Sequence, residues 1–306
     1  MSINYQQIID SIRDDMQPFL RQGKVASYIP ELATVSPDQF GIAVYCVDGK
    51  TYTAGDADTK FSVQSVTKLF ALALAFSEEG DAIWKRVGKE PSGNPFNSLV
   101  QLEYECGIPR NPFINAGALV ISDILTSRHG QADLAVRDFI RLVADEPALA
   151  FDEDVARSER ENTHRNHAIA YLMKDFGNLH NDVKTVIDAY CRQCSISMTC
   201  IELAKAASFF AEHGTIPWSC EKVLSPSSSK RMNALMLTCG TYDAAGDFAY
   251  RVGLPSKSGV GGGIVAIVPG ELALTVWSPG LDHTGNSLAG TMALERFTTL
   301  TGRSIF

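Results

Sequence analysis

A serine and a lysine three residues apart are the first pair in this chain that could perform covalent chemistry. Ser65 and Lys68 stand at the start of a predicted helix, where this spacing puts both side chains on one helical face. A serine hydroxyl becomes nucleophilic when a neighbouring base takes its proton, and a lysine whose charge is disfavoured by burial can be that base. The apolar run over residues 69–74 predicts a buried helix and a desolvated Lys68. The pair therefore indicates a nucleophile and its base.

The S-x-x-K pattern by itself also arises by chance. Two more copies occur, Ser219 to Lys222 and Ser227 to Lys230, and neither precedes an apolar helix. The assignment of Ser65 therefore needs support from other parts of the chain.

A lysine-serine-glycine triplet at residues 257–259 gives such support. A K-[S/T]-G triplet on a sheet strand, downstream of S-x-x-K, is typical of penicillin-recognising serine enzymes. The glycines over residues 259–263 allow backbone N–H groups to approach a substrate carbonyl closely. The alternative is an ordinary glycine turn before an edge strand.

Two amides and a carboxylate could bind a small polar ligand. Glu159 and Asn166 are seven residues apart, so a continuous helix would align them on one face, as would suit a ligand with an ammonium group. A solvated helix face is the alternative. Asn115 begins another predicted helix, where capping explains an asparagine as well as function does. Helix N-termini also attract carboxylates, so both roles are compatible.

Patterns for cofactors and metals fail on their context. The glycine pattern G-x-G-x-x-A over residues 261–266 precedes a strand instead of joining a strand to a helix, which excludes a dinucleotide site. The C-x-x-C pair at residues 191 and 194 lacks a second ligand pair, and His164 and His167 lack further clustered ligands. We therefore expect neither a cofactor nor a metal.

The elements that carry these residues predict an α+β fold. A hairpin over residues 40–53, turning at Asp48-Gly49, and strands at 263–268 and 272–277 flank a segment, 65 to about 216, that is nearly all helical. Strands at both ends of the chain predict an antiparallel sheet formed from both termini, with a helical region inserted. Further helices are expected over about 3–22, 228–239 and 284–300, with helix ends at Gly80, Gly130, Gly177, Gly214 and Gly240 and a capping box from Thr199 to Glu202.

Taken in order along the chain, these segments resemble the serine-dependent glutaminase family, which shares the fold of class A β-lactamases and penicillin-binding proteins. The resemblance covers almost the whole chain from Tyr28 onwards. It implies one glutaminase domain, with an α/β part at about 1–62 and 228–306 and a helical part at about 63–227. The matching segments are 28–32 (YIPEL), 61–68 (FSVQSVTK), 111–118 (NPFINAGA), Ser158-Glu159, Arg165-Asn166, 190–196 (YCRQCSI), 239–246 (CGTYDAAG) and 257–263 (KSGVGGG).

The resemblance implies that the enzyme hydrolyses the side-chain amide of L-glutamine through a glutamyl-serine ester. Ser65 would be the nucleophile and Lys68 would take its proton, while Tyr28 and Tyr242 would share proton transfer to the leaving ammonia. The backbone N–H groups of Ser65 and Val260 would form the oxyanion hole.

The same resemblance assigns the amino-acid end of the substrate. Glu159 would bind the α-ammonium group, and Asn115, Asn166 and Tyr190 would hold the α-carboxylate and α-amino end. Gln64, Tyr242 and Val260 complete the residues expected at the substrate. The family also implies a homodimer or homotetramer.

Bulk properties limit the partners and the compartment. The 306 residues carry a net charge of −8 with both signs mixed, which argues against a nucleic-acid partner. The N-terminus lacks the basic and then apolar pattern of a signal peptide, and no apolar run reaches the ~20 residues that span a bilayer. Seven cysteines without regular spacing fit a reducing compartment. We therefore expect a cytoplasmic protein that does not interact with membranes.

Two other functions compete with this interpretation. A β-lactamase or penicillin-binding peptidase would need an export signal and an S-D-N triplet, and the sequence shows neither. A silent amino-acid sensor of the same fold would be expected to lack Ser65 or Lys68, and both are present.

Overall fold

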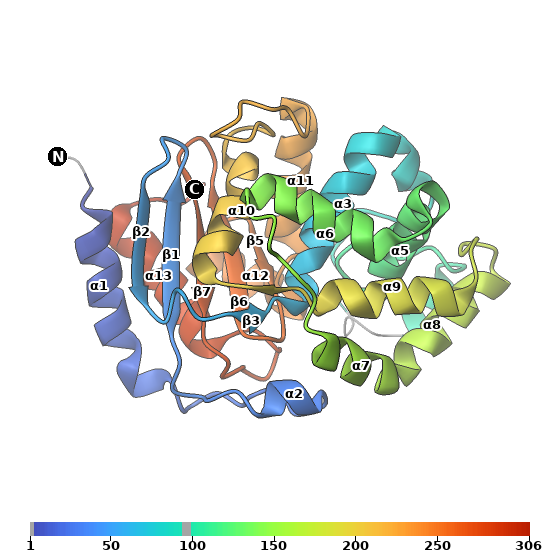
Figure 1. Ribbon diagram of the computed structural model, residues 1–306, viewed down its shortest axis with the longest axis horizontal. Helices are drawn as coiled ribbons and strands as arrows, with labels where there is room; N and C mark the ends of the chain where they lie inside the picture. Colours follow the sequence, from blue (N-terminus) through green and yellow to red (C-terminus); the bar gives the residue numbers. More distant parts are fainter. Residues whose placement is uncertain (1–2, 94–98) are drawn as a thin grey trace.

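Strands from the two ends of the chain form a single five-stranded antiparallel sheet, as the sequence predicts. The computed structural model describes residues 3–93 and 99–306 (Figure 1). The sheet order is β2-β1-β7-β6-β5, and a separate two-stranded sheet pairs β3 with β4. The strands are β1 (Gly41–Cys46), β2 (Thr51–Gly55), β3 (Phe61–Ser62), β4 (Ser197–Met198), β5 (Ser256–Ser258), β6 (Gly263–Val268) and β7 (Leu272–Trp277).

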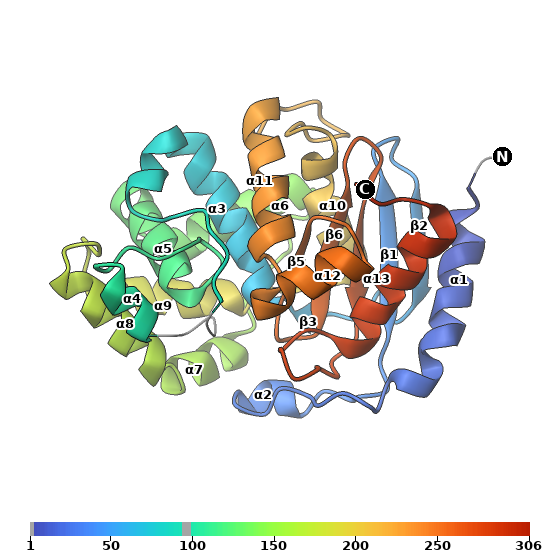
Figure 2. The same ribbon diagram turned by 180° about the vertical axis from the view of Figure 1, so that it is seen from behind.

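Helices cover both faces of the sheet and form a helical body beside it (Figures 1 and 2). They are α1 (Tyr5–Met16), α2 (Pro30–Ala33), α3 (Thr67–Glu79), α4 (Leu99–Tyr104), α5 (Asn115–His129), α6 (Ala132–Ala144), α7 (Glu153–Glu161), α8 (His164–Asp175), α9 (Val183–Cys194), α10 (Cys200–Ala211), α11 (Pro226–Cys239), α12 (Ala245–Arg251) and α13 (Leu288–Thr301), with short 3-10 helices η1 (Gln17–Phe19), η2 (Gln64–Val66), η3 (Gly80–Lys85) and η4 (Tyr242–Ala244). None of the helices within the described ranges is long and apolar enough to cross a membrane.

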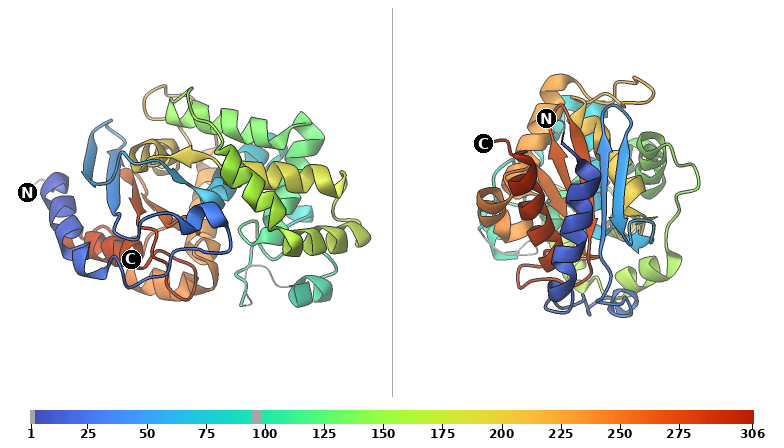
Figure 3. Two further views of the ribbon diagram at one scale, coloured as in Figure 1. Left: turned by 60° about the horizontal axis from the view of Figure 1, so that its bottom comes forward. Right: turned by 90° about the vertical axis from the view of Figure 1, so that its left-hand side faces the viewer.

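The central strands are apolar on both faces because both faces are covered. In β1, Ile42 and Val44 belong to the core shared with α1 and α13, whereas Ala43 and Tyr45 belong to the core shared with α10 and the helical body. This alternation follows from the two-residue repeat of a strand. Seen along the sheet, α1 and α13 lie on one side and the helical body on the other (Figure 3).

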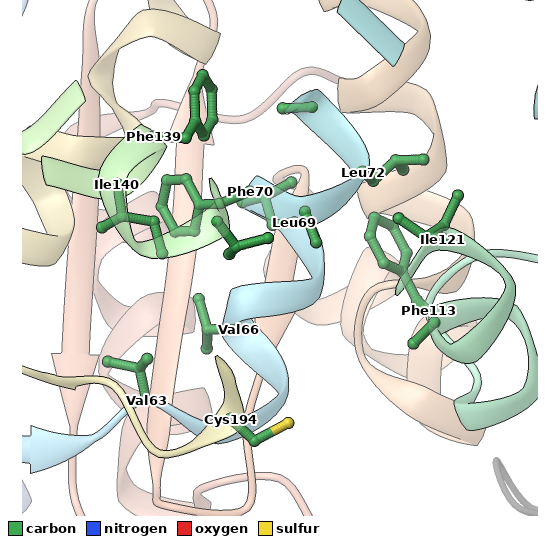
Figure 4. Close-up of a cluster of buried hydrophobic side chains, with 14 of the residues drawn as sticks. Val63, Val66, Leu69, Phe70, Leu72, Phe113, Ile121, Phe139, Ile140 and Cys194 are labelled. Carbon is green, nitrogen blue, oxygen red and sulfur yellow. The ribbon is translucent and has the colours of Figure 1, made fainter. Parts of the chain in front are cut away.

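Helix α3 is the apolar centre of the helical body, and its first turn lies next to η2. Phe139 and Ile140 of α6 flank it on one side, and Phe113 and Ile121 flank it on the other (Figure 4). Burying a large apolar side chain contributes roughly 1.5–3 kcal/mol, so this many contacts fix the position of the helix. Lys68, in the first turn, is buried with it, at 1% exposure.

Several local predictions are confirmed. The hairpin, the strands at 263–268 and 272–277, the helix ends at Gly80, Gly130 and Gly240, and the capping box at Thr199 all occur. Other boundaries were wrong. The opening α-helix ends at Met16, two residues before Pro18, which lies in the 3-10 turn Gln17–Phe19. The last helix begins at Leu288, after Ser287 caps it.

The segment predicted to be helical, 65 to about 216, also contains a helix that packs on the main sheet and a short strand. Helix α10 packs against β1, β6 and β7, and β4 follows α9 to pair with β3 immediately before η2. Both contacts bring the helical body up against the segment that carries Ser65.

Candidate active site

Ser65 is the exposed point of an otherwise buried stretch. All residues from 61 to 73 are buried except Ser65, which is partly exposed. The residue before it, Gln64, has φ +51°, a left-handed conformation that is unfavourable for a residue with a side chain. Gln64 is buried and donates to Ser62 Oγ at 3.0 Å, which helps to hold this bend. The bend presents Ser65 at the start of α3.

The lysine three residues later lies in a nearly dry environment. Lys68 Nζ donates to Asn115 Oδ1 at 2.7 Å and to the Phe113 carbonyl at 3.2 Å, and it lies 5.7 Å from the centre of the Tyr190 ring. Burial lowers the pKa of Lys68 to about 8, while Cys194 and Glu159 act in the opposite direction. Roughly a tenth of Lys68 is therefore the neutral amine at pH 7, the form that can accept a proton, and this fraction grows as pH rises.

Two glycines let the loop between β5 and β6 lie directly on the serine segment. A Cβ at Gly259 would stand 2.6 Å from the Val63 carbonyl oxygen, and one at Gly261 would stand 2.1 Å from the Ser62 carbonyl oxygen. Real side chains do not tolerate such distances, so this approach requires glycine. It brings the backbone of Val260 to the serine.

Tyr242 joins the serine to this loop. Burial raises the pKa of its hydroxyl. Hydrogen bonds with the Ser65 side chain and with the Val260 backbone lower this pKa, but by less. Tyr242 is the first residue of η4 and has φ +59°. Its hydroxyl therefore meets the nucleophile and one of the expected oxyanion donors at once.

Asn115 connects the lysine to the opposite wall of the site. Its Oδ1 accepts from Lys68 Nζ and, at 3.3 Å, from the Tyr190 hydroxyl, and its Nδ2 donates to Asn166 Oδ1 at 2.9 Å. Asn166 in turn donates to Thr163 Oγ1. The side chain of Asn115 does not cap α5, so the capping explanation is wrong.

Glu159 and Asn166 reach the same site by a different route from the one predicted. The helix is not continuous: α7 ends at Glu161, Asn162 and Thr163 break it, and α8 starts at His164. The alignment therefore comes from the packing of two helices and not from helical periodicity. Burial raises the pKa of Glu159 to about 7, opposed by Lys68 and by a hydrogen bond with Gln64.

Tyr28 belongs to a strap, residues 24–33, that crosses beneath the site. The strap is tied to the loop before α13 by paired backbone bonds between Lys24 and Leu281, and α2 at its end packs against α7. Tyr28 is 55% exposed, yet desolvation of its hydroxyl, and then the charge of Glu159, raises its pKa well above the usual range. The two facts fit a ring with one face in solvent and its hydroxyl in the site.

A cavity of about 240 Å³ unites the predicted residues. All of them line this cavity except Lys68, which donates to the lining residue Asn115. A larger hollow of about 680 Å³ between η3 and α11 has no serine among the described residues that line it. The cavity is lined by Tyr28, Gln64, Ser65, Asn115, Glu159, Asn162, Thr163, Arg165, Asn166, Tyr190, Cys194, Tyr242 and Val260.

Lys257 and Cys194 are the neighbours that sequence reasoning missed. Lys257 is fully buried, donates to the Gly240 carbonyl at 3.0 Å and lies 4.8 Å from the centre of the Tyr242 ring. Burial, and then the nearby Lys68, hold its pKa well below the usual range. The triplet at 257–259 was the available signal for Lys257. Cys194 stood out only as part of a C-x-x-C pair, which gave it no role in the site, and burial raises the pKa of its thiol to about 12.

The remaining candidate motifs lie away from the site. Ser219 and Lys222 flank a loop, and Ser227 and Lys230 stand on the exposed start of α11. All seven cysteines, each within the described ranges, are free. Among the described residues, no group of three or more histidine, cysteine or acidic side chains could hold a metal ion. The glycine pattern at 261–266 does lead into strand β6.

Comparisons with known proteins agree on one family. The sequence model described as Glutaminase matches residues 23–306. Proteins named Glutaminase from Paraburkholderia phytofirmans and Agrobacterium fabrum are 60% and 54% identical over 304 residues, covering 99% and 98% of this chain and 100% and 98% of theirs.

Solved structures superimpose over the full length. A probable glutaminase, ybaS, has a TM-score of 0.95 at 35% identity, covering 100% of this chain and 99% of its own. A probable glutaminase from Bacillus subtilis, described as complexed with 6-diazo-5-oxo-L-norleucine, has a TM-score of 0.90 at 33% identity, covering 100% and 98%. The β-lactamase-like α+β architecture predicted from the sequence is therefore confirmed.

Proposed function

The chain belongs to the glutaminase family, and on that basis we propose that it hydrolyses L-glutamine through a glutamyl ester on Ser65. Its family and relatives give the overall reaction, the conversion of glutamine to glutamate. The observation that carries the proposed chemistry is Ser65, partly exposed in a buried stretch, with a buried amine of lowered pKa one helical turn away.

In the first half of the reaction, Ser65 Oγ attacks the side-chain amide carbon while its proton passes to the neutral amine of Lys68. The carbonyl oxygen becomes an oxyanion, which the backbone N–H groups of Ser65 and Val260 stabilise by about 3–4 kcal/mol each. The C–N bond then breaks and ammonia leaves with a proton delivered through Tyr242, which already contacts the serine. Tyr28 lines the same cavity and serves as a second polar contact.

In the second half, water attacks the ester and the same bases work in reverse. Water gives one proton to the site and its oxygen bonds to the acyl carbon, so glutamate is released and Ser65 regains its hydroxyl proton. No other reactant is needed.

The opposite wall of the cavity binds the amino-acid end of the substrate. Ionised Glu159 pairs with the α-ammonium group, and the amides of Asn115 and Asn166, with the Tyr190 hydroxyl, donate to the α-carboxylate. Gln64 positions Glu159. The relative complexed with 6-diazo-5-oxo-L-norleucine, an analogue that retains the α-amino and α-carboxyl groups, supports a site of this design.

A covalent label tests the nucleophile. We expect 6-diazo-5-oxo-L-norleucine to alkylate the serine oxygen with loss of dinitrogen, giving one adduct per chain on the peptide that contains Ser65. Intact mass and peptide mapping read the result, and excess L-glutamine should protect. An adduct on any other residue would remove Ser65 from the proposal.

A substitution of Glu159 tests the amino-acid end. Glu159→Gln removes a desolvated charge that pairs with the α-ammonium group, and we expect kcat/KM for L-glutamine to fall on the order of 100-fold. Glutaramate lacks the α-amino group, so its slow hydrolysis should not fall further. Steady-state ammonia release measures both substrates.

Glu161→Gln is the matched control, because Glu161 is an exposed acid two residues away on the same helix. We expect it to resemble the wild type. Equal hydrolysis of glutaramate and L-glutamine by the wild type would remove Glu159 from this role.

We also propose that the whole chain works as one domain, since the cavity takes residues from the strap, both helical walls and the β5–β6 loop. The cytoplasmic location and the homodimer or homotetramer stay predictions. Chromatography with light scattering would measure the oligomer.

A further inference from the structure

Tyr242 reaches the nucleophile through a backbone conformation that a tyrosine does not adopt by itself. Its φ of +59° lies in the left-handed region, which is unfavourable for a residue with a Cβ and persists where neighbouring contacts enforce it. The peptide that joins Thr241 to Tyr242 sets this angle. Whatever holds the Thr241 carbonyl therefore also sets the direction of the Tyr242 side chain.

Asn286, 45 residues further along the chain than Thr241, holds that carbonyl. Its Nδ2 donates to the Thr241 oxygen at 3.2 Å, and the Ala244 N–H donates to the same oxygen at 3.2 Å. Asn286 is only 1% exposed, and Thr241 is buried equally deeply. A flip of this peptide would take the carbonyl away from both donors, so the pair of bonds selects the observed conformation.

Asn286 is itself fixed in a tight turn. Its backbone N–H donates to Asp282 Oδ1 at 3.2 Å, its carbonyl accepts from the Asp282 N–H at 2.8 Å, and its Nδ2 also donates to Thr284 Oγ1 at 2.8 Å. The side-chain amide thus has a fixed direction before it meets Thr241.

The same turn packs against the ring of Tyr242. A Cβ on Gly285 would lie 3.8 Å from ring carbon Cε2, an ordinary contact distance, so the turn is a wall for the ring. Leu281, at the start of the turn, shares a small apolar cluster with Tyr242 and Val260. This turn, 281–286, lies in the loop that leads from β7 to α13, at the end of the sheet where α2 lies (Figures 1 and 2).

We propose that Asn286 is a positioning residue for the reaction, which acts by fixing the Thr241–Tyr242 peptide so that the Tyr242 hydroxyl meets Ser65 and the Val260 backbone. Asn286 does not line the cavity, so it acts through Tyr242 and not on the substrate. The inference rests on the proposed function, because it needs Tyr242 to work at the serine.

A double-mutant cycle with Tyr242→Phe tests the inference. We expect Asn286→Ala to lower kcat for L-glutamine on the order of 10- to 100-fold, as for other residues that orient a reacting group, with a smaller change in KM. In the Tyr242→Phe background, where the hydroxyl is gone, Asn286→Ala should cost less than about twofold. If the two losses multiply, Asn286 acts elsewhere and the inference fails.

A matched control separates positioning from general stability. Asn233 on α11 makes the same kind of bond, Nδ2 to the Phe210 carbonyl at 3.2 Å, with its Oδ1 buried as well. Asn233→Ala should lower the thermal unfolding midpoint to a similar extent but leave kcat within about twofold. An equal loss of kcat in both variants would overturn the inference.

A second variant and a second measurement complete the test. If Asn286→Ala does not give folded protein, Asn286→Asp keeps the shape and loses the donor, and the same cycle applies. Labelling by 6-diazo-5-oxo-L-norleucine is followed in parallel. Failure of the wild type to be labelled at Ser65 counts against the proposed function, whereas labelling at Ser65 with additive mutant effects counts against the inference alone.

Discussion

Replacing Ser65 with alanine is expected to abolish the release of ammonia from L-glutamine. In the proposed mechanism the hydroxyl oxygen forms the ester, and Lys68 cannot substitute for it because Lys68 is buried, is hydrogen-bonded to Asn115 and to the Phe113 carbonyl, and does not line the cavity. Removing the nucleophile of a serine hydrolase costs on the order of 10⁶ in kcat, so we expect no turnover above background. Ammonia release from purified protein, without added nucleotide or metal, measures it.

The other serines with a lysine three residues later are natural controls. Ser227→Ala, at the exposed start of α11, should retain full activity, since Lys230 there is exposed to solvent and neither residue lines the cavity that contains Ser65. The Ser65→Ala protein should also unfold at close to the wild-type temperature. Turnover retained in a folded Ser65→Ala variant would refute the serine mechanism and leave an activated water as the nucleophile.

The features predicted well from the sequence are those whose cause is local. Thr199 and Glu202 form their capping box within a single turn, and the alternation in β1 requires only that both faces are covered. The proposed nucleophile was predicted the same way, because a helix turn alone places Ser65 and Lys68 together. The order of motifs along the chain then supplied the rest of the cavity.

The features that sequence reasoning missed depend on contacts between distant segments. Asp123, in the middle of α5, is fully buried and accepts from Arg86 at 2.5 Å and from the backbone of His180 and Asn181, and no pattern around it announces this. The break between α7 and α8 was likewise invisible, because both flanks have helical composition. Asn286 has meaning only when its turn is folded against Thr241.

Two residues of the site have backbone conformations that depend on such distant contacts. Gln64 and Tyr242 line the same cavity as Ser65, and both have positive φ. Sequence cannot show such strain, because it is a property of what surrounds the residue. A rigid surrounding is what allows it, and both residues are buried.

Replacing Lys68 with methionine is expected to lower kcat for L-glutamine strongly and to change the pH profile of the reaction. Loss of a general base lowers kcat by about 10²–10⁴, and we expect the upper end because Lys68 serves both halves of the reaction. Methionine keeps the volume of the side chain and removes a buried amine, so the fold should be retained. Ammonia release across a range of pH measures the effect.

The sign of the pH effect follows from the two shifted groups. Lys68 must be neutral and Glu159 ionised, and with pKa values of about 8 and about 7 both fractions grow as pH rises. Wild-type kcat/KM should therefore increase from pH 6 through pH 8 and level off above about pH 9. In Lys68→Met the step near pH 8 should vanish, leaving the rise that belongs to Glu159.

Glu159→Gln offers a check on this assignment, because its negative charge raises the pKa of Lys68. Without that charge the pKa of Lys68 should fall, so the upper step in kcat should move to lower pH although the overall rate is smaller. Lys230→Met, the exposed control, should reproduce the wild-type profile. A step near pH 8 that persists in Lys68→Met would assign it to another group, and the buried Lys257 beside Tyr242 would then be the base to test.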